Sequence, residues 1–106
     1  MSDDNTYQRN LIKERWQDEI LNFVYNDGIY NRLVFTGGTC LRKVYGLNRL
    51  SEDLDFDIPA STSFDIQTFA KDLGKYLSAG TKISGNNATV FVKFPDNIFM
   101  RCDFSK

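Results

Sequence analysis

Histidine is absent from this chain of 106 residues, and its absence excludes several kinds of active site. Without an imidazole, the chain has no Ser-His-Asp or Cys-His nucleophile and no histidine ligand for zinc. The two cysteines, Cys40 and Cys102, lie far apart and outside any CxxC spacing, which argues against a disulfide scaffold and a zinc site. We therefore expect both to be small buried hydrophobic residues. Chemistry must then rest on carboxylates, cations, hydroxyl groups and backbone amides.

A long apolar run and an excess of charge of one sign are also missing. No apolar stretch approaches the roughly 20 residues that span a bilayer, and the first residues lack the basic and apolar segments of a signal peptide. We therefore expect a cytoplasmic protein without membrane contact. Thirteen Lys and Arg residues against fourteen Asp and Glu residues leave a net charge of -1. Any binding of phosphate groups must therefore be local.

The composition is typical of one folded domain. Apolar residues make up 42% of the chain and charged residues 25%, as in ordinary soluble proteins. A chain of this length has room for a single modest core. We therefore expect one domain over residues 1–106.

Apolar periodicity predicts the elements of this domain. Residues 7–26 and 63–77 have apolar side chains at helical spacing, and Asp27-Gly28 is expected to end the first helix. A short helix is expected from Thr39 to Gly46. Strands are expected at 33–36, 53–58, 81–84, 89–94 and 98–104, the last three as an antiparallel hairpin or meander.

This order of elements predicts an α+β fold (mixed α/β), with a mixed sheet packed against two or three helices. The chain stops just after its last strand, which we expect to be an edge of the sheet. Because an autonomous domain usually covers such an edge, we expect the sequence to be one part of a longer protein.

The turn Gly37-Gly38-Thr39 lies where a strand is predicted to pass into a helix. Two glycines let the backbone approach a ligand closely, and the free amides of the following helix favour an anionic phosphate. The Thr39 hydroxyl can contact the same group. Arg42 is either a further phosphate ligand or an ordinary surface cation. The turn predicts a cradle for nucleotide phosphates, although a glycine pair alone is usually only a turn.

Three aspartates alternate with apolar residues in the strand predicted at 53–58. Asp53 and Asp55 therefore lie on the same side, where their oxygens can bind hard cations such as Mg²⁺ or Mn²⁺. Like charges this close repel one another unless a cation compensates them. We predict that Asp53 and Asp55 bind metal ions, with Asp57 replacing Asp53 if the register is shifted by two. The alternative is a solvated strand face.

A further acid, Asp103, lies within the apolar last strand, on the same side as Arg101. It can complete the site if the hairpin packs beside the acidic strand, and the alternative is a charge on an edge strand. In a two-metal mechanism the ions lie about 3.5 to 4 Å apart. They activate an acceptor hydroxyl and stabilise the departing pyrophosphate during attack on the α-phosphate.

The segment from Phe35 to Ile58, FTGGTCLRKVYGLNRLSEDLDFDI, resembles the active-site signature of the AbiEii/AbiGii toxin family. This family is a branch of the DNA polymerase β-like nucleotidyltransferase superfamily, with a GG[ST] turn, a DxD strand and a third acid on a later strand. The resemblance implies that Gly38 and Thr39 bind the phosphates of a nucleoside triphosphate and that Asp53 and Asp55 hold metal ions. It also implies that Asp103 is a metal ligand and the base for the acceptor hydroxyl.

The same resemblance implies the toxin of a toxin-antitoxin or phage-defence pair, with an antitoxin protein as partner. Some family members resemble enzymes that add nucleotides to transfer RNA, so transfer RNA or another RNA is a candidate acceptor. Family members are longer than this chain. The alternatives are therefore a truncated, non-catalytic head that acts as an interaction module, or a head for antibiotic or protein nucleotidylation. A calcium-binding module is disfavoured because DLDFDIP lacks the glycine and distal glutamate of an EF-hand loop.

Overall fold

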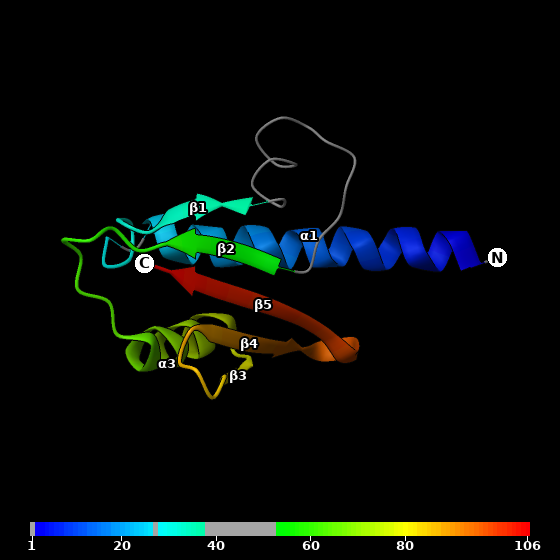
Figure 1. The fold of residues 1–106 in the computed structure, drawn as a ribbon. Helices are drawn as coiled ribbons and strands as arrows, with labels where there is room; N and C mark the ends of the chain where they lie inside the picture. The colour runs from blue at the N-terminus through cyan, green and yellow to red at the C-terminus, as the bar shows by residue number, and fades with distance from the viewer. Residues whose placement is uncertain (1, 27, 38–52) are drawn as a thin grey trace.

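The computed structural model describes residues 2–26, 28–37 and 53–106 of the chain. In these ranges it has two α-helices, five β-strands and one short 3₁₀ turn, arranged as in Figure 1. The helices are α1 (Ser2–Asn26) and α3 (Ile66–Leu77). The strands are β1 (Val34–Thr36), β2 (Asp53–Asp57), β3 (Gly80–Ile83), β4 (Thr89–Phe94) and β5 (Ile98–Ser105), with η1 (Pro95–Asn97) before the last. The predicted elements are confirmed, except that the short helix from Thr39 to Gly46 lies outside the described residues.

The five strands form one mixed sheet in the order β1-β2-β5-β4-β3 (Figure 1). β3, β4 and β5 form an antiparallel meander, as predicted, and β1 is antiparallel to β2. β5 is parallel to β2, so the chain between them must cross back, which it does through α3 and the β3-β4 hairpin. With both helices, this mixed sheet confirms the α+β fold class.

The expectation that the last strand is an edge of the sheet was wrong. β5 lies between β2 and β4, and the outer strands are β1 and β3. Its inward side chains are buried along its whole length: Ile98, Met100, Cys102 and Phe104. These side chains show which face of β5 meets the core, whereas its pairing with β2 and β4 on both edges makes it a central strand. Asp103 is therefore a residue of a central strand and not an edge charge.

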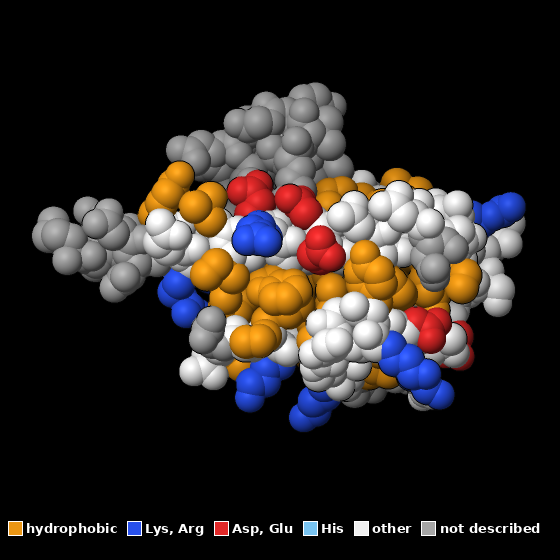
Figure 2. All heavy atoms as spheres, turned by 180° about the vertical axis from the view of Figure 1, so that it is seen from behind, with side chains coloured by type: hydrophobic (Ala, Val, Ile, Leu, Met, Phe, Trp, Pro, Cys, Tyr) orange, Lys and Arg blue, Asp and Glu red, His pale blue; other side chains and the backbone are white. Residues whose placement is uncertain are grey.

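Both helices pack on the same side of the sheet, behind it in the view of Figure 1. Trp16 of α1 stacks on Phe94 with ring centroids 4.2 Å apart, and Phe69 of α3 meets Phe104 edge-on at 5.1 Å. Figure 2 shows the molecule from this side, where hydrophobic side chains form a band among charged ones. The core therefore lies between the helices and one face of the sheet. Neither of the two described helices covers the other face, here called the open face.

The ends of the elements agree with local sequence signals. α1 ends at Asn26, just before Gly28 with its positive φ of 82°. Asp65 caps α3, because its carboxylate accepts a hydrogen bond from the Gln67 amide at 3.1 Å. Asn87 and Asn97 have left-handed backbones in the two turns flanking β4. No helix among the described residues is both long and apolar enough to cross a membrane.

Candidate active site

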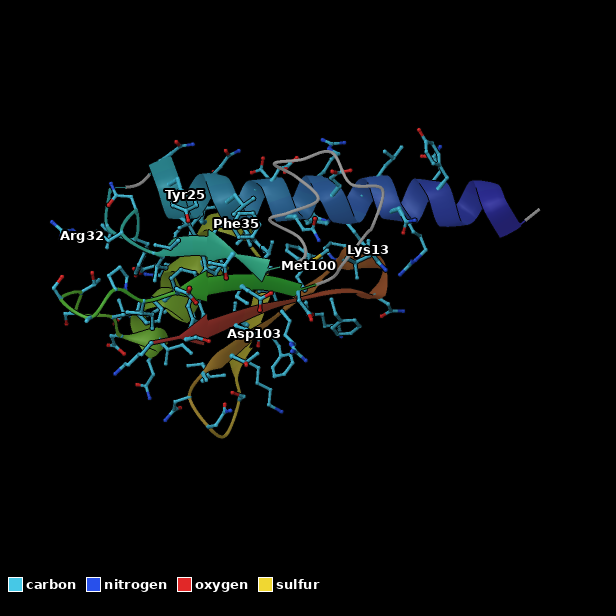
Figure 3. The ribbon with its side chains drawn as sticks, turned by 45° about the horizontal axis from the view of Figure 1, so that its top comes forward. Lys13, Tyr25, Arg32, Phe35, Met100 and Asp103 are labelled. Carbon is cyan, nitrogen blue, oxygen red and sulfur yellow. The ribbon has the colours of Figure 1, made fainter. Side chains whose placement is uncertain are left out.

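The predicted acids meet on the open face of the sheet. Strand pairing places Thr36, Asp55, Asp103 and Thr89 opposite one another in one row across β1, β2, β5 and β4. Opposite residues on paired strands point to the same side, and Asp53 lies two residues from Asp55 on that side. Figure 3 labels Asp103 on β5, next to β2. Asp53, Asp55 and Asp103 are all half-buried, whereas their neighbours Leu54 and Cys102 are buried in the core.

Arg101 lies among these carboxylates and holds two of them. Its Nε and Nη2 donate to Oδ2 of Asp103 at 3.2 and 3.0 Å, and its Nε lies 3.7 Å from Oδ1 of Asp53. The other oxygen of Asp103, Oδ1, accepts a hydrogen bond of 2.7 Å from the Thr89 hydroxyl. Both Asp103 oxygens therefore have donors on the protein, and the guanidinium is the counter-ion of the acidic pair.

The electrostatics of the site centre on Asp55. Partial burial raises the pKa of its carboxyl above the ordinary 3.8, and the nearby charges of Asp103 and Asp53 raise it further. Arg101 acts in the opposite direction but does not cancel these effects. Hydrogen bonding to Asp103, with the charges of Asp103 and Asp53, raises the pKa of the Arg101 guanidinium. The described residues on the open face of the sheet thus have a surplus of negative charge around Asp55, which favours a bound cation.

Gly37 brings the backbone against the Asp55 carboxylate. Its φ is +84°, and a methyl group built on its Cα would overlap Oδ2 of Asp55 and lie 3.0 Å from the Asp55 Cγ. Only glycine satisfies both the left-handed backbone and this close approach. The predicted glycine turn therefore begins directly beside the predicted acids.

The other predicted site residues have different outcomes. Gly38, Thr39 and Arg42 lie outside the described residues, so their roles stay predictions. Asp57 is exposed on the same face as Asp55, opposite Ser105, and is one row away from Asp103.

Of the two cysteines, Cys40 also lies outside the described residues. Cys102 is fully buried, and burial raises the pKa of its thiol well above its usual range. Cys102 is therefore a core residue, as expected.

The donor set has the chemistry of a hard-cation site, because carboxylate oxygens are the ligands that Mg²⁺ and Mn²⁺ prefer. In residues 2–26, 28–37 and 53–106, however, no group of three or more acidic or sulfur side chains is arranged to hold a metal ion. In this structure the guanidinium of Arg101 is the cation that pairs with Asp53 and Asp103. The carboxylate oxygens of Asp53, Asp55 and Asp103 are suitable ligands for a divalent cation once the Arg101 side chain has moved away from them.

Sequence reasoning did not assign a role to Arg101 or Thr89. Arg101 precedes Asp103 by two residues in a strand, so the alternation already placed both on one side. Its pairing with Asp53 depends on β2 lying beside β5. Thr89 meets Asp103 only through the β4-β5 register.

A family model described as nucleotidyl transferase AbiEii toxin, type IV toxin-antitoxin system, matches residues 19–96 of the chain. The matched segment is most of the chain and includes Gly37, Asp53 and Asp55, whereas Asp103 follows it. No curated protein and no solved structure matches the chain.

Proposed function

The chain belongs to the AbiEii family of nucleotidyl transferase toxins, and from this premise we propose that it is a metal-dependent nucleotidyltransferase. It takes a nucleoside monophosphate from a nucleoside triphosphate and transfers it to an acceptor hydroxyl, with an RNA such as transfer RNA as the acceptor. The family is that of the toxins of type IV toxin-antitoxin systems. We therefore propose an antitoxin protein as the partner of this chain.

One observation supports this proposal most directly. Asp55 and Asp103 are direct neighbours in the parallel register of β2 and β5, and Gly37 lies against Asp55 on the same open face. A solvated strand face requires neither an acid on a second, central strand nor a left-handed glycine packed on one carboxylate. Acidic oxygens beside Gly37, the first residue of the predicted phosphate turn, support the proposal.

The residues divide the work of the reaction as follows. Asp53 and Asp55 would hold the divalent cations, and these ions would supply positive charge to the acceptor oxygen and to the departing pyrophosphate. The acceptor oxygen forms a bond to the α-phosphorus while the bond from that phosphorus to the oxygen of the pyrophosphate breaks. Asp103 takes the proton of the acceptor hydroxyl. The turn from Gly37 to Thr39 binds the triphosphate through backbone amides.

Arg101 must leave Asp103 before Asp103 can act as ligand or base, because its two hydrogen bonds occupy Oδ2 of Asp103. The Arg101 side chain is 47% exposed, so it can swing toward solvent without disturbing the core. Arg101 compensates the acids in this structure, and Asp53, Asp55 and Asp103 would be the residues that hold a divalent cation once its guanidinium has moved away.

The test combines metal binding with transfer. Mn²⁺ is titrated into the full chain with and without each of the four nucleoside triphosphates, and binding is measured by paramagnetic broadening of backbone NMR signals. Transfer is measured with α-³²P-labelled nucleotides and total transfer RNA. We expect broadening centred on Asp53, Asp55 and Asp103 that one nucleotide strengthens.

Four aspartate-to-asparagine variants complete this test. Asp53→Asn, Asp55→Asn and Asp103→Asn should each weaken Mn²⁺ binding by more than about tenfold, the loss that even outer partners of a metal site cause. Asp57→Asn is the matched control, since it removes the same charge from the same strand. If Asp57→Asn loses Mn²⁺ binding and Asp53→Asn keeps it, the metal ligand is Asp57 in place of Asp53. Unchanged spectra at millimolar Mn²⁺ would reject the catalytic proposal and favour a non-catalytic interaction module.

A further inference from the structure

The open face of the sheet continues from the carboxylates into an aromatic and basic surface on the meander. Its residues, here called the aromatic platform, are Phe91 and Lys93 of β4, Phe99 of β5 and Lys82 of β3. All four are exposed, while the alternate residues Val90, Val92 and Met100 are buried on the other side. The platform therefore lies on the face away from both helices, the same face as the predicted acids.

The two phenylalanines form one apolar surface. Phe91 is 41% exposed and Phe99 is 51% exposed. In the β4-β5 register Phe91 lies opposite Arg101 and Phe99 opposite Lys93, so the two rings are diagonal neighbours on adjacent strands. Diagonal neighbours are within reach of one another when the side chains are aromatic. A single exposed ring needs no explanation, but two exposed rings at diagonal positions on one side of a sheet offer a ligand two aromatic partners.

Each ring has a lysine beside it. The Lys93 Nζ lies over the Phe99 ring, 5.9 Å from its centroid. Lys82 lies directly opposite Phe91 in the β3-β4 register. The platform thus has two cations and no acid. Its chemistry suits a ligand that combines flat aromatic groups with negative charge, which is the chemistry of a single-stranded nucleic acid.

The platform is continuous with the predicted active site. One row crosses four neighbouring strands and contains Asp53, Arg101, Phe91 and Lys82 in that order. Because neighbouring strands are about 4.8 Å apart, Phe91 on β4 lies about 10 Å from the acids of β2. A strand whose end lies at the carboxylates would pass over the two rings.

We propose that the aromatic platform binds the single-stranded end of the nucleic acid whose terminal hydroxyl accepts the nucleotide. This inference rests on the proposed function and names the surface that holds the acceptor. Bases stack on Phe91 and Phe99, and Lys82 and Lys93 neutralise phosphates. Because every base has a flat face, the platform tolerates many sequences and prefers single strands, whose bases are free, to duplexes.

The test measures RNA binding without nucleotide or divalent metal. Fluorescence anisotropy of a labelled single-stranded RNA of about 12 nucleotides, a length typical of one such site, is titrated with the full chain. Phe91→Ala and Phe99→Ala should each weaken binding roughly five- to a hundredfold, and Phe99→Trp should retain it. Lys82→Ala and Lys93→Ala should each reduce the slope of log affinity against log salt by about 0.7.

Matched controls lie on the two helices. Tyr7→Ala removes an exposed aromatic residue of α1, and Lys71→Ala removes an exposed lysine of α3. Neither should change RNA affinity. Since the platform side chains are exposed, their variants should fold normally, which thermal melts followed by circular dichroism will verify.

The outcomes separate this inference from the proposed function. Wild-type RNA affinity in both Phe91→Ala and Phe99→Ala would overturn the platform, even if the chain transfers nucleotides. Platform-dependent RNA binding without transfer from any triphosphate would reject the proposed function and leave the platform in place. Sedimentation tests the competing occupants, a second copy of this chain and a protein partner. If the phenylalanine substitutions abolish self-association or antitoxin binding but not RNA binding, the platform is a protein interface and the inference is wrong.

Discussion

Replacing Gly37 by alanine tests the contact between the glycine turn and Asp55. Gly37 has a φ of +84°, a conformation that costs an alanine about 1 to 2 kcal/mol. The new methyl group would also overlap Oδ2 of Asp55 and lie 3.0 and 3.1 Å from the Asp55 Cγ and Cβ. Moving that side chain off its rotamer costs about 0.5 to 1.5 kcal/mol more. We therefore expect Gly37→Ala to lower the free energy of unfolding by about 1.5 to 3.5 kcal/mol.

Gly28→Ala is a matched control for this substitution. Gly28 has nearly the same φ, +82°, but a methyl group there meets nothing within 4 Å. It should lose only the backbone term of about 1 to 2 kcal/mol. Alanine also lowers the conformational entropy of the unfolded chain, which stabilises both variants by a similar amount. This contribution therefore cancels when the unfolding free energies of the two variants are compared. The difference of about 1 kcal/mol between the two variants therefore measures the contact with Asp55.

The assay is urea denaturation of the full chain followed by circular dichroism. The single variant Asp55→Ala and the double variant with Gly37→Ala complete a double-mutant cycle with wild type and Gly37→Ala. Because Asp55→Ala removes the Cγ and Oδ2 contacts, most of the extra cost of Gly37→Ala should disappear in that background. Equal destabilisation by Gly37→Ala and Gly28→Ala in the wild-type background would refute the close approach of the turn to the carboxylate.

Three further predictions follow from the charges on the chain. Because the folded-state pKa of Asp55 is raised, the folded protein keeps that proton longer than the unfolded chain, and its stability falls as the pH rises through the window above 3.8. In urea titrations, the free energy of unfolding of Asp55→Asn should therefore rise relative to that of wild type as the pH increases from about 3 to 7. A difference between the two proteins that stays constant with pH would contradict this reasoning. Hydrogen bonds from the Thr68 hydroxyl and the Gln67 amide lower the pKa of Asp65, so Asp65→Ala should be less stable than wild type at neutral pH. That deficit should shrink below pH 3.8 in thermal melts, and Ser63→Ala, at an exposed position near the same helix start, should show no such pH dependence. Arg101→Met should bind Mn²⁺ more tightly than wild type in calorimetric titrations, because the competing guanidinium is gone; weaker binding would mean that Arg101 supports the metal site.

The local elements were predictable because their signals lie within a few residues. Alternation of aspartates with Leu54 and Phe56 predicted both sides of β2, and apolar side chains at helical spacing predicted α3. Asp27-Gly28 was expected to end the first helix, and α1 ends at Asn26. Each of these features depends on backbone preferences and side-chain direction, which neighbouring residues decide.

The place of β5 in the sheet was not predictable in the same way. A strand with one apolar side has the same pattern at an edge and in the centre, because the pattern reports which side is buried and not which strands pair with it. The parallel pairing of β5 with β2 brings Asp103 opposite Asp55 although 48 positions separate them in the sequence. The same pairing places Arg101 between Asp103 and Asp53, which no local signal indicates.

The sequence by itself determined the kinds of group available and the sides on which they lie. It has no histidine, a glycine pair after a strand, and acids at alternate positions of β2, and these features pointed to phosphate and metal chemistry. The tertiary structure decided which of these groups meet. It placed Asp103 on a central strand, set Arg101 among the acids and joined them to Phe91 and Phe99 on one open face. The physical reason is that side-chain direction follows from the backbone of each strand, whereas the neighbours of a strand depend on how the whole sheet buries its apolar face against α1 and α3.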